Sequence, residues 1–163
     1  MSSTAVPVAR PSLSWRVIVP GLLASLLLAM WQMIVEALIP NGAGFWAPPV
    51  YIAATVLRDL QSAGSPAAFN LLGVVLGLMG HMMNSVIFGL IFALLIAPRL
   101  PALARRIAGG VVYGVVVFVG MWFLILPLVD PVMLNLNAAV FFLGHIMWGA
   151  ALAAVNYLVG AKA

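Results

Sequence analysis

Four long apolar stretches dominate this chain of 163 residues. Each holds about twenty residues or more, the length that an α-helix needs to cross the roughly 30 Å hydrocarbon layer of a membrane. Apolar residues make up 66% of the chain and charged residues 6%, whereas soluble domains average about 45–50% and 25%. The sequence therefore predicts an all-α integral membrane protein, a four-transmembrane-helix up-down bundle, and we expect it not to be an enzyme.

Turn-forming residues set the expected limits of the four helices. Prolines 40, 98 and 127 each follow an apolar run, and proline does not readily extend a helix. The predicted membrane helices are 16–39, 69–97, 107–126 and 138–160. Residues 1–15 and 161–163 are predicted to be short ends, and segment 45–62 a short helix at the outer membrane–water interface. A signal peptide is the competing interpretation of the first stretch, but the stretch exceeds the usual 7–15 apolar residues.

The basic residues predict the orientation of the bundle. Only Arg58 falls on one side of the predicted helices, and the other basic residues fall on the opposite side. These are Arg10, Arg16, Arg99, Arg105, Arg106 and Lys162. Cytoplasmic ends carry the excess of Lys and Arg, so we expect both termini in the cytoplasm of a bacterium and the protein in its inner membrane. The net charge of +4 is then an orientation signal, and no nucleic-acid partner is expected.

Five polar residues within or beside the predicted helices form the candidate site. An ionisable side chain that faces lipid is costly, by about 2.5–3.5 kcal/mol at the centre of a helix. Helical positions three and four apart share one face, which predicts inward stripes of polar and small residues. We therefore expect an intramembrane cluster, with the two histidines at similar depth and the acid nearer the outer surface. Its members are Glu36, His81, Asn84, Ser85 and His145.

Small residues at four-residue spacing predict close helix packing. The pairs are Gly21 with Ser25, Gly73 with Gly77, and Gly110 with Gly114. Such pairs support either a bundle within one chain or contact with a second protein. The expected partners are the lipid bilayer and, as alternatives, a second copy of the chain or a larger membrane complex.

Three functions remain open from these residues. A path for a proton, an ion or a small solute is the first, because histidine titrates near neutral pH and Glu36 could exchange protons with the outside. Binding of haem b by His81 and His145, or of a divalent metal by these two residues and Glu36, is the second. A structural role in helix packing is the third. The chain has no cysteine, which excludes thiolate ligands.

Two further residue types receive a structural interpretation. The methionines one or two positions after the histidines, such as Met82 and Met147, are predicted to pack against neighbouring helices, because such positions point in different directions on a helix. Asp130 precedes Pro131 and is predicted to be a turn residue.

Four local patterns resemble the YagU-like family of bacterial inner-membrane proteins. They are Glu36 to Pro40, Pro48-Pro49 to Arg58-Asp59, His81 with Ser85 and Phe88, and Gly144-His145 with Trp148. The resemblance extends over most of the chain from the first helix onward, with a shorter first external loop and no long charged C-terminal tail. It implies the fold and the polar positions, but this family supplies no established reaction, ligand or cofactor.

Overall fold

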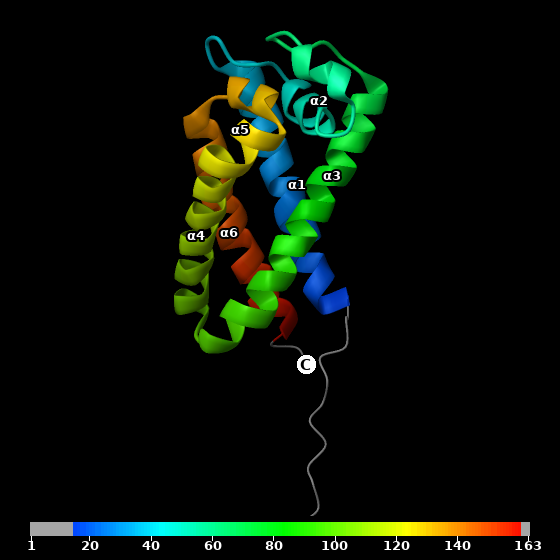
Figure 1. Ribbon diagram of the computed structural model, residues 1–163. Helices are drawn as coiled ribbons and strands as arrows, with labels where there is room; N and C mark the ends of the chain where they lie inside the picture. The colour runs from blue at the N-terminus through cyan, green and yellow to red at the C-terminus, as the bar shows by residue number, and fades with distance from the viewer. Residues whose placement is uncertain (1–14, 161–163) are drawn as a thin grey trace, which may run out of the picture.

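The computed structural model describes residues 15–160, and four of its helical segments are long and apolar enough to cross a membrane. The segments are Trp15–Leu38, Leu71–Arg99, Leu103–Val129 and Ala138–Gly160. They form an antiparallel bundle (Figure 1). The predicted all-α four-helix membrane bundle is confirmed. Arg10, Lys162, and most of the two predicted ends lie outside the described residues.

The two central segments are built from more than one type of helix. The second segment consists of α3 (Leu71–Ile91), the π-helical turn η2 (Phe92–Ile96) and the 3₁₀ turn η3 (Ala97–Arg99). The third consists of α4 (Leu103–Gly120), the π-helical turn η4 (Met121–Ile125) and α5 (Leu126–Val129). The 3₁₀ turn η5 (Pro131–Asn135) then leads to α6 (Ala138–Gly160).

The predicted range 107–126 for the third helix is too short at both ends. The helix starts at Leu103, so Arg105 and Arg106 belong to its first turn. It also continues past Pro127, which lies at the start of α5, directly after the π-helical turn η4. The first, second and fourth predictions agree with α1 (Trp15–Leu38), α3 to η3, and α6 to within two residues.

The order of packing leaves one side of the bundle open. Helix α1 packs against α3 and α6, and α6 packs against α1 and α4. Helix α3 meets α4 mainly through η2, and the two helices diverge towards the opposite end of the bundle (Figure 1). This divergence leaves a space between α3 and the segment η4–α5.

Glycines allow the close helix contacts that the small-residue pairs predicted. A Cβ on Gly110 would overlap the carbonyl oxygen of Gly149, and one on Gly114 would overlap that of His145, so α4 and α6 meet backbone to backbone. A Cβ on Gly21 would lie 2.8 Å from the carbonyl oxygen of Ser85. These faces are therefore occupied within the chain. Gly73 is different, since its backbone N–H binds the N-capping side chain of Asn70.

The predicted short helix forms as α2 (Ala47–Ala53), followed by the 3₁₀ turn η1 (Arg58–Ser62). Helix α2 lies at one end of the bundle, where it packs mainly against α3, and most of its residues are buried (Figure 1). Tyr51 is completely buried, and its hydroxyl donates a 2.8 Å hydrogen bond to the carbonyl oxygen of Gly64. The Pro49 carbonyl lies where a Cβ on Gly77 would be. The missing side chain at Gly77 therefore allows α2 to press against α3.

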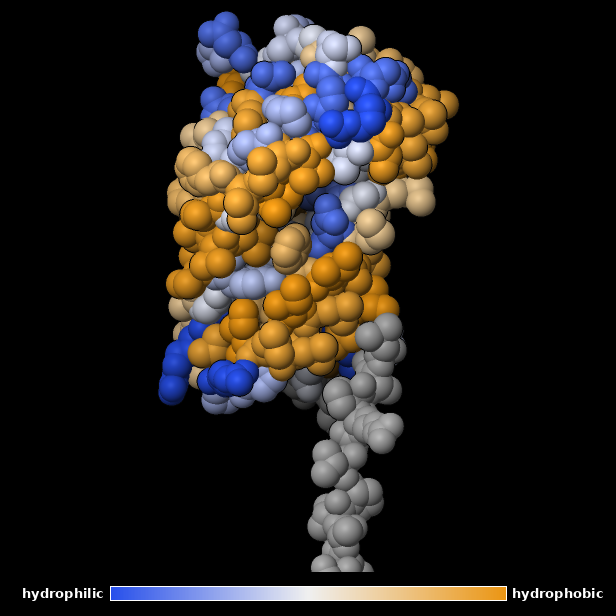
Figure 2. Space-filling view, in the orientation of Figure 1, coloured by the Kyte–Doolittle hydropathy of each residue, from blue (hydrophilic) through white to orange (hydrophobic). Residues whose placement is uncertain are grey.

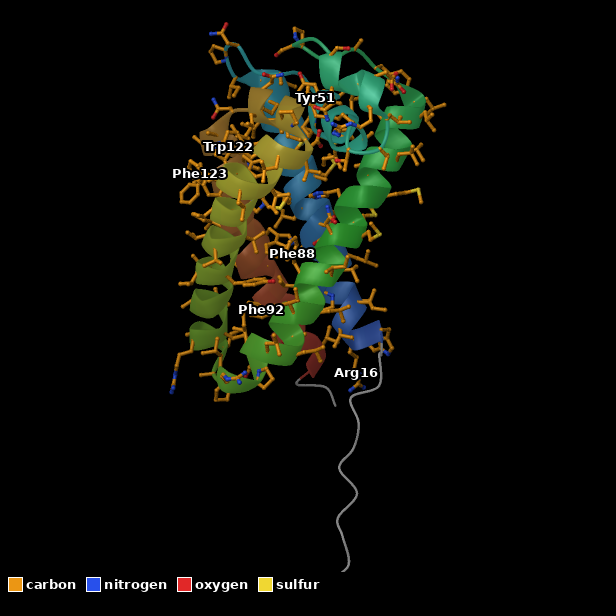
Figure 3. The ribbon with its side chains drawn as sticks, in the orientation of Figure 1. Arg16, Tyr51, Phe88, Phe92, Trp122 and Phe123 are labelled. Carbon is orange, nitrogen blue, oxygen red and sulfur yellow. The ribbon has the colours of Figure 1, made fainter. Side chains whose placement is uncertain are left out.

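The surface of the bundle has the pattern of a multi-pass membrane protein. On the face that Figure 2 shows, a broad apolar band covers the middle, and hydrophilic residues gather at the two ends. Phe123 points outward from η4, Arg16 lies at one end of the bundle, and Tyr51 lies near the other (Figure 3).

Candidate functional site

A cavity of about 240 Å³ occupies the space between α3 and η4–α5. Helices α1 and α6 form its back wall, and its walls are mainly apolar side chains such as Leu28, Met121 and Phe141. Its polar lining residues are Gln32, Thr55, His81, Asn84, Ser85, Asp130 and His145. Turn η4 contributes Met121 and Ile125, and π-helical turns of this kind are frequent at functional sites.

The mouth of the cavity faces the membrane. Four of the lining residues, Thr55, Asn84, Ile125 and Val129, are exposed, and Asn84, Ile125 and Val129 belong to the membrane-spanning segments. Figure 2 shows hydrophilic atoms in a hollow within the apolar band. The mouth therefore opens between membrane-spanning segments, at the level of the apolar band.

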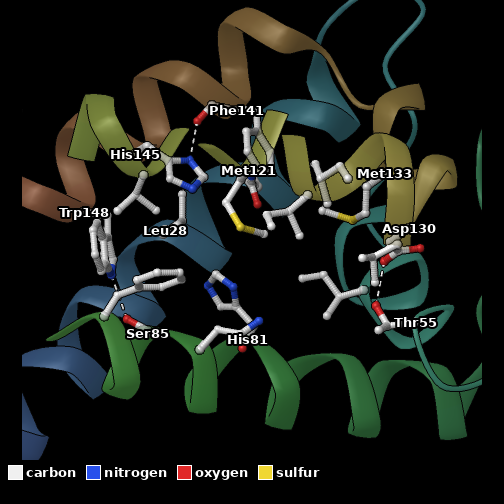
Figure 4. Close-up of a pocket in the computed structure, with 18 residues that line it drawn as sticks. Leu28, Thr55, His81, Ser85, Met121, Asp130, Met133, Phe141, His145 and Trp148 are labelled. Carbon is white, nitrogen blue, oxygen red and sulfur yellow. Dashed lines mark hydrogen bonds between the residues drawn. The ribbon is translucent and has the colours of Figure 1, made fainter. Parts of the chain in front are cut away.

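Both histidines are held by backbone carbonyls and keep one ring nitrogen free. In His145 on α6, Nδ1 lies 2.8 Å from the carbonyl oxygen of Phe141. In His81 on α3, Nε2 lies 3.2 Å from the carbonyl oxygen of Ser25 on α1. A carbonyl oxygen can only accept, so each of these nitrogens carries the proton in the neutral ring. Nε2 of His145 and Nδ1 of His81 are then lone-pair acceptors. Both rings point into the cavity, with Met121 beside them (Figure 4).

Ser85 joins three helices at the inner end of the cavity, the end nearest the turn where α3 leads into α4. Its hydroxyl donates a 2.7 Å hydrogen bond to the carbonyl oxygen of Gly21 on α1. The same oxygen accepts a 2.7 Å hydrogen bond from Nε1 of Trp148 on α6. Ser85 is therefore fully used as a packing contact, although it belongs to the predicted site.

Gln32 is a buried amide without a partner for its nitrogen. Its exposed fraction is 2%, it lines the cavity, and Nε2 has no hydrogen-bond partner among the described protein atoms. Gln32 and His81 also line a second space of only about 10 Å³, so the two side chains lie close together. A buried amide that lacks a bond costs about 1–3 kcal/mol, so a partner for this enclosed nitrogen would stabilise the protein.

Asp130 forms the outer end of the cavity, and the prediction of a simple turn residue was incomplete. It is 3% exposed, and its carboxylate accepts hydrogen bonds from Thr55 (2.9 Å) and from Gln61. Burial raises the pKa of Asp130, while the Thr55 and Gln61 hydrogen bonds and nearby Arg58 counteract this increase. The sequence signal for this contact was that Asp130 and Arg58 fall at the same predicted end of the bundle. Helical periodicity could not pair them, because they lie in two separate loops.

Glu36 lies outside the cavity, so its placement in the cluster is corrected. Its carboxylate accepts hydrogen bonds from the backbone nitrogens of Ala43 (2.9 Å) and Asn137 (2.7 Å). Asn137 directly precedes α6, and a carboxylate at a helix N-terminus is electrostatically favourable. Glu36 thus fastens the turn after α1 to the start of α6, while His81, Asn84, Ser85 and His145 share the cavity.

The cavity is closed on the side of the bundle where α3 leads into α4. Phe92 and Leu152 are completely buried there, and Trp148 is 2% exposed. The hydroxyl of Tyr113 is also occupied, because it donates a 2.9 Å hydrogen bond to the carbonyl oxygen of Phe88. Asn156 lies farther along α6 and accepts a hydrogen bond from Arg106. The described residues therefore form a pocket with a closed inner end.

The site fits the predicted cofactors poorly. No three His, Cys, Asp or Glu residues within 15–160 form a group that could hold a metal ion, so the proposed ligand set of His81, His145 and Glu36 does not assemble. Typical ligand pockets have volumes of about 300–1,000 Å³, and a cavity of about 240 Å³ is too small for a haem macrocycle unless its walls move.

Comparisons with known proteins add no family to this geometry. No protein-family model, no curated protein and no solved structure matches the chain. The resemblance to the YagU-like family remains a prediction, and the functional argument depends on the cavity.

Proposed function

We propose that this protein binds a small, mainly apolar solute in the cavity between α3 and η4–α5, as part of small-solute homeostasis at the membrane. This is a binding role and not catalysis. The observation that carries the proposal is the cavity itself, which is apolar along its walls, open towards lipid and equipped with a few polar groups. That combination is typical of small-molecule sites.

The closed inner end argues against a continuous path for protons or ions. A relay needs polar groups from one side of the bilayer to the other. The cavity lining ends at Trp148, which belongs to a buried apolar cluster with Phe92 and Leu152. A structural role alone explains Ser85, whose hydroxyl donates one interhelical hydrogen bond and accepts another. It does not explain the partnerless Nε2 of Gln32 or the free nitrogens of the two histidines.

We also propose the bacterial inner membrane as the location, with both termini in the cytoplasm. Arg16, Arg99, Arg105 and Arg106 lie at the end of the bundle where α1 begins and α6 ends, while Arg58 lies at the opposite end with η1 (Figure 1). The positive-inside rule assigns the first end to the cytoplasm. The mouth of the cavity, bordered by Thr55 and Val129, then lies in the outer half of the bilayer.

The proposal is tested with 4-propylphenol as the probe and the protein in phosphatidylethanolamine–phosphatidylglycerol nanodiscs. Empty nanodiscs measure the partition of the probe into lipid. We expect a saturable component in calorimetric titration of the wild type, and its loss in Met121→Trp, where the larger side chain fills the cavity. Met79→Trp is the matched control, because Met79 is 62% exposed on the lipid face of α3 and should leave binding unchanged.

Absence of saturable binding in the wild type would refute the proposal. Binding that persists unchanged in Met121→Trp would place the probe elsewhere and refute it as well.

A soft metal ion is the second candidate, supported by the histidine hydrogen bonds. Metal-binding histidines almost always donate their other ring N–H to a carbonyl or carboxylate, and His81 and His145 both do so. Met121 adds a thioether to the same cavity, and Cu(I) prefers soft ligands. Equilibrium dialysis with Cu(I) would favour this candidate if one equivalent binds to the wild type and none to Met121→Leu.

A further inference from the structure

The polar groups at the back of the cavity define what a ligand must offer. The Nδ1 atom of His81 is a hydrogen-bond acceptor, because Nε2 of the same ring donates to Ser25. The Nε2 atom of Gln32 is a donor without a partner among the described protein atoms, and the residue is only 2% exposed. The two side chains lie together, since both also line the adjoining space of about 10 Å³. A ligand that satisfies both must donate one hydrogen bond and accept another at neighbouring positions.

The charges around the cavity indicate a neutral ligand. Among the described residues that line it, none is a lysine or an arginine, so no basic side chain is present to neutralise an anion. Asp130 is the one lining carboxylate, and it already accepts from Thr55 and Gln61. An unpaired charge buried in an apolar site is strongly unfavourable. A hydroxyl group meets both requirements, because a single oxygen donates and accepts without carrying a charge.

The walls and the mouth describe the rest of the molecule. Leu28, Ile52, Phe88 and Val117 supply apolar surface to the same cavity. The volume of about 240 Å³ limits the ligand to a compact body. The exposed rim residues Asn84 and Ile125 belong to membrane-spanning segments, which allows entry from lipid.

We propose that the ligand is a neutral alcohol or phenol with a compact apolar body, held by its hydroxyl group between His81 and Gln32. The hydroxyl hydrogen donates to Nδ1 of His81. The hydroxyl oxygen accepts from Nε2 of Gln32 after the amide, whose nitrogen is enclosed in the empty protein, turns towards the cavity. Ser25 fixes the orientation of the imidazole by accepting from its other nitrogen. This inference rests on the proposed function, since it names the class of solute that the cavity binds.

The experiment compares 4-propylphenol with its methyl ether, 4-propylanisole, in the same nanodiscs. The ether keeps the apolar body and the acceptor oxygen but has no hydrogen to donate. A hydrogen bond of about 1–1.5 kcal/mol corresponds to roughly tenfold in affinity, so the dissociation constant of the ether is expected to be about tenfold higher in the wild type. Each value is corrected for partition into empty nanodiscs.

Two variants assign the two hydrogen bonds separately. His81→Phe removes the acceptor nitrogen and keeps an aromatic ring, so the difference between phenol and ether is expected to vanish. Gln32→Met removes the donor, so both probes are expected to bind several-fold more weakly while their ratio stays near tenfold. Because Gln32 Nε2 has no partner in the empty protein, Gln32→Met is also expected to raise the melting temperature without ligand, which a residue needed only for packing would not do.

The outcomes separate the inference from the function on which it rests. Equal affinities of phenol and ether in the wild type, with binding still lost in Met121→Trp, would overturn the hydroxyl assignment and leave solute binding intact. If neither probe bound to the wild type in a saturable manner, both the hydroxyl assignment and the proposed solute binding would be overturned. If His81→Phe does not fold, the wild-type ratio and the Gln32→Met variant decide the question.

Discussion

The indole Nε1 of Trp148 donates a 2.7 Å hydrogen bond to the hydroxyl of Ser85. The same hydroxyl donates to the carbonyl oxygen of Gly21, so one side-chain oxygen joins α6, α3 and α1. Both side chains are almost completely buried. This junction closes the inner end of the cavity and sets the spacing of three helices around it.

Ser85→Ala should destabilise the bundle, because it removes the acceptor for Trp148 and the donor to Gly21. Interhelical hydrogen bonds in membranes average about 0.6 kcal/mol and reach about 1.7 kcal/mol, so the loss of two predicts roughly 1–2 kcal/mol. Equilibrium unfolding in mixed micelles measures this loss in the free energy of unfolding. Ser62→Ala, which removes an exposed hydroxyl on η1, should change the free energy of unfolding by less than about 0.5 kcal/mol.

Gly110→Ala should force α4 and α6 apart, because the new Cβ would overlap the carbonyl oxygen of Gly149. Overpacking of this kind typically costs about 1–3 kcal/mol. Gly120→Ala lies on the same helix with nothing within 4 Å of the new Cβ, and should be neutral or slightly stabilising. Thermal unfolding of the two variants checks the contrast, and equal melting temperatures would contradict the close approach.

Glu36→Gln should destabilise the protein by about 1.5–3 kcal/mol, the range for hydrogen bonds to a charged group. Both carboxylate oxygens accept backbone N–H groups, from Ala43 and Asn137, and an amide supplies only one acceptor. Asp59→Asn, at an exposed acid on η1, is the control. Chemical denaturation measures both variants, and an equally small effect in each would show that Glu36 is not a structural anchor.

Asp130→Asn should change how stability depends on pH. Since the folded-state pKa of Asp130 is raised above its usual value of 3.8, the folded protein holds this proton more tightly than the unfolded chain does. Its contribution is therefore most favourable below about pH 4 and falls as the pH rises through the folded-state pKa. The melting temperature of the variant relative to that of wild type should increase from pH 4 upward. A constant difference would contradict the raised pKa.

Single cysteines should report the orientation of the bundle, since the chain has none of its own. Asp59→Cys lies on η1 and Ala102→Cys just before α4, and both positions are exposed. A membrane-impermeant maleimide should label Asp59→Cys in spheroplasts, and Ala102→Cys only after the membrane is permeabilised. The reverse pattern would invert the proposed topology.

The number, type and approximate limits of the membrane helices could be predicted from the sequence. Hydrophobic length depends on the residues of one segment alone, so the four apolar runs were sufficient. The small-residue spacing likewise identified Gly110 and Gly114 as contact positions, because a short side chain permits close approach whichever helix it meets. His81, Asn84, Ser85 and His145, which the sequence placed in one cluster, line the same cavity, since few polar side chains occur in these spans and the interior is the favourable place for them.

The partners of those side chains depended on tertiary structure. Glu36 and Asp130 lie at the same end of the bundle, yet only Asp130 borders the cavity, because the positions of the turn at 39–44, α2 and η1 are set by contacts between segments distant in sequence. The free nitrogens of His81 and Gln32 could not be identified from the sequence, because only the fold shows which neighbours a side chain has and whether one of them is a hydrogen-bond partner. Local periodicity determined which residues lie inside; long-range packing decided which of them were left available to a ligand.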